Sequence, residues 1–393
     1  MLKVIQFAEQ VAPYAISLRR HFRMHPETGR KEFQTQERIM AELTKMGLKP
    51  QKINGTGVLA EIKGAKPGKT AALRADIDAL PVNDEIEQPY KSTVAGVSHA
   101  CGHDAHIALA LGVAKLFTLA QNELCGKVRF LFQPSEELLP DGGALGMIAA
   151  GALDGVDAII GAHVWQPIEV GKIGIAHGKL MAAPDEFAIT IKGRGGHGSM
   201  PQQTIDPIVV GAQIILLLRA ITASAIDPRE SAVLTVGMFK AGEVFNIIPD
   251  TAVIKGTVRS FAEDVRTKIH QQIDQICRGC CQTMGADYEL KTTLGFPPVI
   301  NDPAISRLLA AASQEILGAD SVEEIQPTLV AEDFSYYLEK VPGAYFFLGA
   351  GNKQEGIVFP HHHPKFDIDE GCLQNGIGVM AAAILKILEG GEK

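Results

Sequence analysis

The feature that most constrains the fold is a change of pattern near residue 182. Before it, short apolar runs that predict buried strands alternate with segments of helical periodicity, which is typical of a mostly parallel sheet with helices on both faces. Residues 184–294 instead predict strand, helix, two strands, helix and strand, the order of a ferredoxin-like α+β unit. We therefore predict an α/β catalytic domain in two parts, 1–183 and 295–393, interrupted by a smaller domain at 184–294.

The bulk composition is that of a globular protein and argues against several classes. The 393 residues, of which 46% are hydrophobic and 21% charged, suffice for two or three domains. A net charge of −8 argues against a nucleic-acid surface. Residues 1–22 lack the continuous apolar stretch of a signal peptide, and the apolar run 208–218 is about half the length of a membrane span. We expect a cytoplasmic protein with no nucleic-acid or membrane partner.

Four clusters of metal-binding residue types lie at or just after predicted strands of the α/β domain, where open α/β sheets build their sites. Each cluster alone has an ordinary explanation, such as a buried thiol, a solvated carboxylate or a core histidine. A fold that brings all four to neighbouring strand ends explains them together, and thiolate, imidazole and carboxylate are the ligands of zinc and related ions. The clusters are Cys101 with His103, Glu136 with Glu137, His163, and the histidines at 361–363.

The paired glutamates indicate hydrolysis of an amide. Adjacent residues on extended backbone point to opposite sides, so that one can bind metal while the other acts as general base. A divalent ion lowers the pKa of a bound water from about 15.7 to about 7. Two ions would need a bridging ligand, such as Cys101 or Glu137. Because alternate side chains on extended backbone point the same way, Cys101 and His103 can face one metal site. Consecutive side chains point to opposite sides, so residues 361–363 cannot all be ligands.

Two other functions are compatible with these residues. A thiol enzyme would use Cys101 as the nucleophile with His99 or His103 as its base. A non-catalytic metal-binding module is disfavoured by the paired glutamates. The cysteines at 277, 280 and 281 fall on one face of a predicted helix, where we expect buried thiols rather than a second metal site. Metal analysis, chelation and alkylation would separate these alternatives.

A set of motifs occurs in a fixed order along nearly the whole chain. The motifs are "RADIDALP", "HACGHDAH", "QPSEE", "GAHVW", "GRGGHGSMP", "NIIPD", "GTVRSF", "AEDFS" and "HHPKF". With this set the chain resembles the bacterial and plant metallo-amidohydrolases that include N-acyl-L-amino acid amidohydrolase, hippurate hydrolase, indole-acetyl-amino acid hydrolase and a thermostable carboxypeptidase. The resemblance implies hydrolysis of small N-acyl amino acids, with carboxypeptidase or dipeptidase activity, or N-acetyl-diaminopimelate deacetylation, as the alternative.

The resemblance also implies a dinuclear metal centre and its catalytic base. Glu136 matches the base, and Asp76 matches an acidic position where we expect it to orient a histidine. We give Asp104 at most a similar supporting role, and His99 and His106 supporting or structural roles. Two divalent ions per subunit, whether zinc, manganese, cobalt or nickel, would be held by Cys101, His103, Glu137, His163 and His362.

For the smaller domain the resemblance implies a lid and dimerisation module in a homodimer or homotetramer. His197 matches a histidine that reaches the active site of the partner subunit, where a donor would stabilise the oxyanion. Asn246 and Arg259 match positions near the substrate carboxylate, which arginine can bind with two parallel hydrogen bonds. His361 departs from the pattern, because relatives often have an aliphatic residue there.

Overall fold

The computed structural model describes residues 4–139 and 142–390. Contacts divide the chain into two compact units, each with its own hydrophobic core. The large domain comprises Met1–Leu180, Ile300–Pro327 and Asp333–Lys393, and the small domain comprises Met181–Val299 and Thr328–Glu332.

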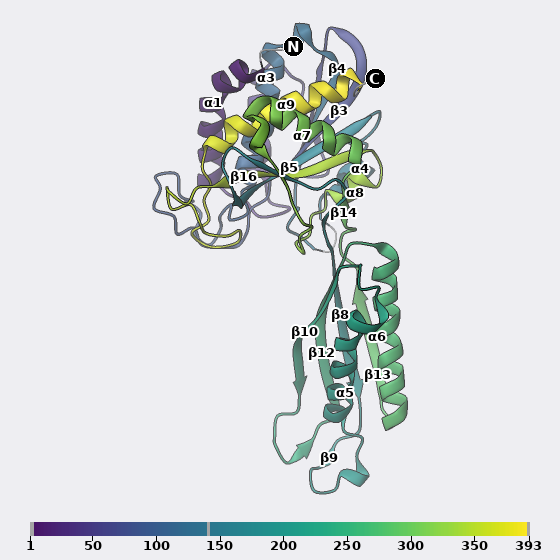
Figure 1. The fold of residues 1–393 in the computed structure, drawn as a ribbon. Helices are drawn as coiled ribbons and strands as arrows, with labels where there is room; N and C mark the ends of the chain where they lie inside the picture. Colours follow the sequence, from purple (N-terminus) through teal and green to yellow (C-terminus); the bar gives the residue numbers. More distant parts are fainter. Residues whose placement is uncertain (1–3, 140–141, 391–393) are drawn as a thin grey trace. The chain divides into compact units, whose positions relative to one another are not determined.

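The large domain is built on an eight-stranded sheet in the order β1-β2-β4-β3-β5-β16-β6-β15 (Figure 1). Strand β3 runs parallel to β4 and β5, β16 parallel to β5, and β15 parallel to β6, so the sheet is mostly parallel. The strands are β1 Gln51–Ile53, β2 Gly57–Lys63, β3 Lys66–Asp76, β4 Cys125–Gln133, β5 Ala158–Glu169, β6 Ile173–Ile175, β15 Val322–Glu324 and β16 Gly343–Gly351.

Helices α1, α3 and α9 pack against one another, and α7 packs against α9 (Figure 1). Helix α3 is buried on nearly all sides, because it lies between α1, α9 and the sheet, and its sequence is correspondingly apolar all round. The helices are α1 Val4–Met24, α2 Phe33–Lys45, α3 His103–Leu119, α4 Ala144–Ala149, α7 Pro303–Leu317, α8 Ser335–Leu338 and α9 Gly371–Glu389.

The small domain has the predicted ferredoxin-like arrangement. Its antiparallel sheet has the order β10-β12-β8-β13, and helices α5 and α6 contact each other and the sheet. The predicted fold class is therefore confirmed. The elements are β8 Ala183–Lys192, α5 Pro207–Ala220, β10 Ala232–Ala241, β12 Thr251–Ser260, α6 Glu263–Met284 and β13 Asp287–Thr293, with a two-stranded ribbon of β9 Gly196–His197 and β11 Ile247–Ile248 and the short strands β7 Lys179–Met181 and β14 Val299–Ile300.

Helix α5 begins as its sequence predicts and continues further than expected. Asp206 accepts a hydrogen bond from the Ile208 amide, and a proline occupies the first helical position. A π-helical turn extends the segment to Ala225, so that Pro207–Ala225 is long and apolar enough to cross a membrane by length and composition alone. Helix α9 also passes this test, but 72% of its window is buried as a core helix, against 28% for Pro207–Ala225.

The cysteines of helix α6 belong to the core of the small domain. Cys277, Cys280 and Cys281 are free and buried, and burial raises the pKa of Cys277 to about 12. All three pack among the apolar side chains of this core, as free cysteines commonly do. The expectation of buried thiols is therefore confirmed.

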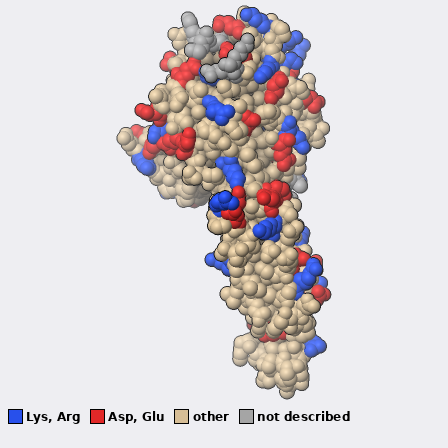
Figure 2. Space-filling model, turned by 45° about the vertical axis from the view of Figure 1, so that its right-hand side comes forward, with Lys and Arg blue, Asp and Glu red and all other residues tan. Residues whose placement is uncertain are grey.

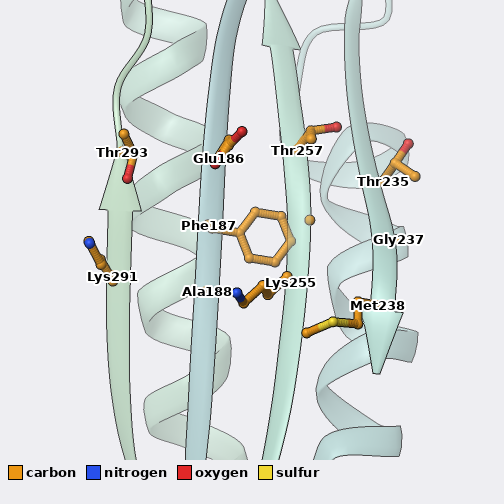
Figure 3. A pocket seen from close by; sticks show the side chains of 11 residues that line it. Glu186, Phe187, Ala188, Thr235, Gly237, Met238, Lys255, Thr257, Lys291 and Thr293 are labelled. Carbon is orange, nitrogen blue, oxygen red and sulfur yellow. The ribbon is translucent and has the colours of Figure 1, made fainter. Parts of the chain in front are cut away.

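The sheet face opposite the core of the small domain forms an open trough (Figure 3). Its lining includes Lys255 and Lys291, and the ring of Phe187 lies towards Gly256. A Cβ atom at Gly256 would come within 2.3 Å of that ring, so only glycine fits this strand position. On the molecular face in Figure 2, basic and acidic side chains are interspersed rather than gathered by sign.

Candidate metal centre

The parallel strands bring the sequence clusters to one edge of the large sheet. Strand β3 ends at Asp76 and β4 ends at Gln133, directly before the loop with the paired glutamates. Strand β5 carries His163, and its neighbour β16 leads into the segment with the histidine run. Because parallel strands share the direction in which they end, these segments meet at the carboxyl edge of the sheet.

Two groups of possible ligands share one sulfur atom. The ligand atoms of Cys101, His103 and His163 lie within 4.8 Å of one another, and so do those of Cys101, Glu137 and His362. A thiolate can bridge two cations, and each ion would then have three ligands from the chain. The structure thus brings together all five residues that the sequence analysis proposed as ligands.

The atoms at this centre are arranged for a cation. His103 Nε2 and Glu137 Oε1 are buried, have no hydrogen-bond partner among the described residues and lie 4.0 Å apart. His362 Nε2 lies 3.4 Å from the same glutamate oxygen, and His163 Nε2 lies 3.4 Å from Cys101 Sγ. Buried polar atoms without partners are costly, and a metal ion would satisfy them. Nitrogen, oxygen and sulfur donors suit zinc and related ions, so the residues fit a dinuclear centre.

Electrostatics at the centre also favour a cation. Burial, together with the charges of Glu137 and Glu136, raises the pKa of the Cys101 thiol well above its ordinary value. Although burial alone would lower it, the pKa of His103 is raised to about 10 by Asp76, Asp78 and Glu137. The surroundings are thus strongly negative, and a bound cation would compensate that charge and displace both protons.

Hydrogen bonds to backbone carbonyls orient two of the histidines. His103 Nδ1 lies 2.9 Å from the Asp78 carbonyl oxygen, and His163 Nδ1 lies 2.7 Å from the Val164 carbonyl oxygen. Each ring therefore donates from Nδ1 and keeps a lone pair on Nε2, the nitrogen that faces the centre. Burial, reinforced by His106 and His361, lowers the pKa of His163 well below its usual range, which keeps that ring neutral for metal binding.

A left-handed glycine, rather than extended backbone, lets Cys101 and His103 face the same centre. Gly102 has φ 91° and His103 is the first residue of α3, so the expectation of extended backbone is wrong here. A Cβ atom at position 102 would approach a Val164 methyl carbon to 2.4 Å. Both the backbone conformation and the space therefore require glycine between the two ligands.

Glu136 and Glu137 also differ from the extended geometry expected of them. Both lie in a turn that follows Ser135, whose φ is 62°. Oxygen atoms of both carboxylates and a ring nitrogen of His103 lie within 4.8 Å of one another. Glu136 is 8% exposed, so its carboxylate is buried beside the ligands, at the position that a general base requires.

The sequence analysis missed Asp78, which holds this turn. Its Oδ1 accepts the Glu136 amide and its Oδ2 the Glu137 amide, each at 3.1 Å. Glu32 fixes the preceding residue, because its Oε1 accepts the Ser135 amide at 2.9 Å. The only signal in the sequence is the second acid of "ADID", two residues after Asp76 at the end of β3.

Asp76 and Asp104 have different surroundings. Asp76 Oδ1 lies 2.5 Å from His106 Nδ1 and 3.6 Å from His103 Nδ1, directly behind the ligands. Burial would raise the pKa of Asp76, but His103, His106 and the neighbouring arginine lower it well below the ordinary value. Asp104 instead pairs with Arg19 of α1 at 2.9 Å, so it anchors α3 to α1.

The structure separates the three consecutive histidines. His361 Nε2 lies 2.8 Å from the Val164 carbonyl oxygen, and burial lowers its pKa to about 4. His362 reaches Glu137, whereas the ring of His363 stacks on Phe359 with centroids 4.7 Å apart. His362 has φ 66°, and this turn points its ring away from those of its neighbours. The spacing of these three histidines in the sequence could not identify which of them faces the metal centre.

In the small domain, Asn246 lies beside His197 and not beside Arg259. The Gly198 amide donates to the Asn246 carbonyl at 2.9 Å within the β9–β11 ribbon, and His197 and Asn246 are both exposed. Arg259 is half-buried on β12, and burial lowers its pKa. It lies eight residues beyond Thr251, the first residue of that strand, which corresponds to roughly 26 Å along the strand.

The chain is similar to known proteins along most of its length. The model of Peptidase family M20/M25/M40 matches residues 72–386. An N-acyl-L-amino acid amidohydrolase of Geobacillus stearothermophilus is 44% identical over 300 residues, covering 76% of this chain and 81% of that protein. Thermostable carboxypeptidase 1 of Saccharolobus solfataricus is 40% identical over 381 residues, covering 96% of each chain.

A solved structure extends the likeness to the whole fold. The YXEP protein of Bacillus subtilis, described as a dinuclear metal binding peptidase from the M20 family, is 35% identical with a TM-score of 0.85, covering 97% of this chain and 99% of that one. The resemblance inferred from the motifs is thereby confirmed. The chain belongs to Peptidase family M20/M25/M40 and is a metal-dependent amide hydrolase.

Proposed function

We propose that the protein hydrolyses the amide bond of small N-acyl amino acids, releasing a carboxylic acid and a free amino acid. The observation that carries this proposal is the pair of ligand groups that share Cys101, with the buried carboxylate of Glu136 beside them. The amidohydrolase from Geobacillus stearothermophilus supports the choice of substrate, since it is 44% identical to this chain. Carboxypeptidase or dipeptidase activity is the alternative, supported by the carboxypeptidase at 40% identity. N-acetyl-diaminopimelate deacetylation, which also cleaves an N-acyl amide, is a further alternative.

The residues of the chain divide the chemistry among them. Two divalent ions, when bound, supply Lewis acidity that polarises the amide carbonyl and acidifies a water. Glu136 accepts a proton from the attacking water and returns it to the leaving nitrogen. His197 donates a hydrogen bond to the carbonyl oxygen as negative charge develops on it. Arg259 binds the carboxylate of the substrate.

We further propose that the two ends of the small domain serve different active sites in a homodimer. Arg259 lies roughly 26 Å by strand rise from Thr251, the end of β12 that pairs with Lys192 and so lies towards His197, and this is farther than one small substrate can span. A site that uses both therefore needs two copies of the chain. In this reading residues 184–294 form the lid and dimerisation domain, and residues 1–183 and 295–393 form the catalytic domain.

The dimer surface that we propose is the outer face of α5 with the adjacent edge strand β10. This face exposes large apolar side chains, including Leu216, which is 73% exposed. Exposed apolar surface and an unpaired strand edge favour association.

We expect Leu216→Glu to yield a monomer by light scattering and Gln271→Glu on α6 to leave assembly unchanged. A tetramer in the unmodified protein would require a second interface. The other exposed apolar residues of this face are Ile208, Val209, Leu217 and Phe239.

A cytoplasmic location is consistent with the cysteines. All six occur as free thiols in the structure, including the one proposed to bridge the ions. Disulfides form and persist in oxidising compartments, whereas a reducing cytosol preserves thiolate ligands.

A substrate panel tests the proposed function. The metal-reconstituted enzyme is assayed on acetyl-, benzoyl- and peptidyl-amino acids, with chelated enzyme and thiol-alkylated holoenzyme in parallel. We expect acyl-amino acids to be cleaved fastest, activity to vanish on chelation, and divalent ions to restore it. Preference for peptides would favour the carboxypeptidase alternative. Activity that survives chelation but not alkylation would contradict the proposal and favour a thiol enzyme.

A further inference from the structure

His361 directly precedes the proposed ligand His362, but it is part of a different set of contacts. Its ring stacks on Trp165 and lies against Phe366, with centroids 4.7 Å away in both cases. Its Nε2 donates to the Val164 carbonyl oxygen at 2.8 Å. The side chain is therefore held on three sides, and its ring also meets that of His163, one of the proposed ligands, with centroids 5.0 Å apart.

The carbonyl that His361 binds also orients a metal ligand. Val164 O accepts a hydrogen bond from His163 Nδ1 at 2.7 Å, and this bond leaves His163 Nε2 facing Cys101. The amide of Val164 donates to His106 Nε2 at 2.9 Å, so the peptide groups on both sides of this residue are fixed. Because a carbonyl oxygen has two lone pairs, it can accept from both histidines at once.

The segment that carries His362 needs such an anchor. Its backbone is left-handed with φ 66°, a conformation that is strained for a non-glycine residue and persists only where neighbouring contacts impose it. The His362 amide donates to the Ala100 carbonyl at 2.8 Å, one residue before Cys101. The bond from His361 to Val164 fixes the other side of this turn to strand β5.

We propose that His361 is a positioning residue that couples the two ion sites. It fastens the segment with His362, a ligand of one group, to the carbonyl that orients His163, a ligand of the other group. The proposal rests on the dinuclear centre of the proposed function. Loss of the His361 side chain frees the His362 turn to relax and weakens the ion held by Cys101, Glu137 and His362.

Three variants of the histidine run test this coupling. His361→Leu removes the donor and keeps an apolar side chain, whereas His361→Gln retains an N–H donor of similar reach. His363→Leu is the matched control, because His363 lies in the same run and stacks on Phe359, away from the ligands. Each apo protein is titrated with Co²⁺ by calorimetry, and the cobalt–thiolate absorption reports on Cys101. Thermal unfolding of the apo proteins checks that each variant folds.

We expect His361→Leu to bind one of the two Co²⁺ ions about 10–100-fold more weakly and the other nearly as before. His361→Gln should recover most of the lost affinity, and His363→Leu should match the unmodified protein. The coupling would be overturned if His361→Leu bound each of the two ions as tightly as the unmodified protein does. A His361→Gln variant that binds as weakly as His361→Leu would also overturn it. If the unmodified protein binds fewer than two ions, the dinuclear centre itself is wrong and the coupling fails with it.

Discussion

The metal centre of the large domain and the β9–β11 ribbon of the small domain hold their functional residues in opposite ways. His103 and His163 are buried, and the second nitrogen of each ring is hydrogen-bonded to a backbone carbonyl. His197 is exposed, and its ring bonds only to the nearby Ser199 among the described contacts. Next to Asn246, the side chain of Phe245 is fully exposed. The first region is held by contacts within its own chain, whereas the second is exposed, and we propose that another copy completes it.

The largest expected effect lies in the buried region. Glu136→Gln keeps the size of the side chain but removes the base, so we expect kcat to fall by roughly 10²–10⁴. Metal content should be unchanged, because Glu136 is not a proposed ligand. Steady-state kinetics with metal analysis measures both quantities. Glu355→Gln, in an exposed loop, is the control, and near-normal turnover in Glu136→Gln would remove the assigned role.

The exposed region should show a smaller effect that depends on a second subunit. His197→Ala should lower kcat by roughly 10²–10³ without loss of metal, since it removes one oxyanion donor. An equimolar mixture with Glu136→Gln, refolded or exchanged to form mixed dimers, should recover about one quarter of the activity, because half of the dimers then have one intact site. A mixture as inactive as its components would show that His197 acts within its own subunit.

Asp78 provides an intermediate test in the buried region, because it acts through backbone amides. Asp78→Asn leaves a single acceptor oxygen for the amides of Glu136 and Glu137, so we expect kcat or metal affinity to fall by about 10–100-fold. The two effects are separated by measuring kcat at saturating Co²⁺. Unchanged kinetics at every metal concentration would show that the turn holds without this carboxylate.

The smallest effect concerns stability of the small domain in acid. Asp185 is buried and bonds to Arg266, His270 and the Gly295 amide; these bonds outweigh desolvation and lower its pKa from 3.8 to about 2. A folded-state pKa below the unfolded one means that the carboxylate stabilises the domain above about pH 4 and loses this contribution as pH falls towards 2. Activity at neutral pH should be unaffected by this titration.

Hydrogen exchange within residues 183–293, measured across that pH range, tests the acid effect. Protection should decline with pH in the unmodified protein. Asp185→Asn should be less protected already at neutral pH, because Arg266 loses its buried partner. Glu289→Gln, which removes an exposed partner of Lys192, serves as the control. Equal protection in Asp185→Asn and the unmodified protein would rule out the ion pair as the cause.

The same contrast explains how much the sequence could predict. The fold class followed from patterns of strands and helices, which depend on local periodicity. The five proposed ligands came from motifs at strand ends, and the choice of His362 within its run needed the family resemblance. Asp78 was missed because it binds backbone amides, which no side-chain motif records. The turn at Gly102 and the convergence of Glu136 and Glu137 depend on left-handed backbone, which alternation rules for extended strands cannot anticipate.

The left-handed backbone of His362 has a consequence for metal choice. A hydrogen bond of the chain itself holds this turn, because the His362 amide donates to the Ala100 carbonyl, one residue before Cys101. We therefore expect the donors at this centre to accept zinc, manganese, cobalt or nickel in turn, since ligand type alone does not select among these ions.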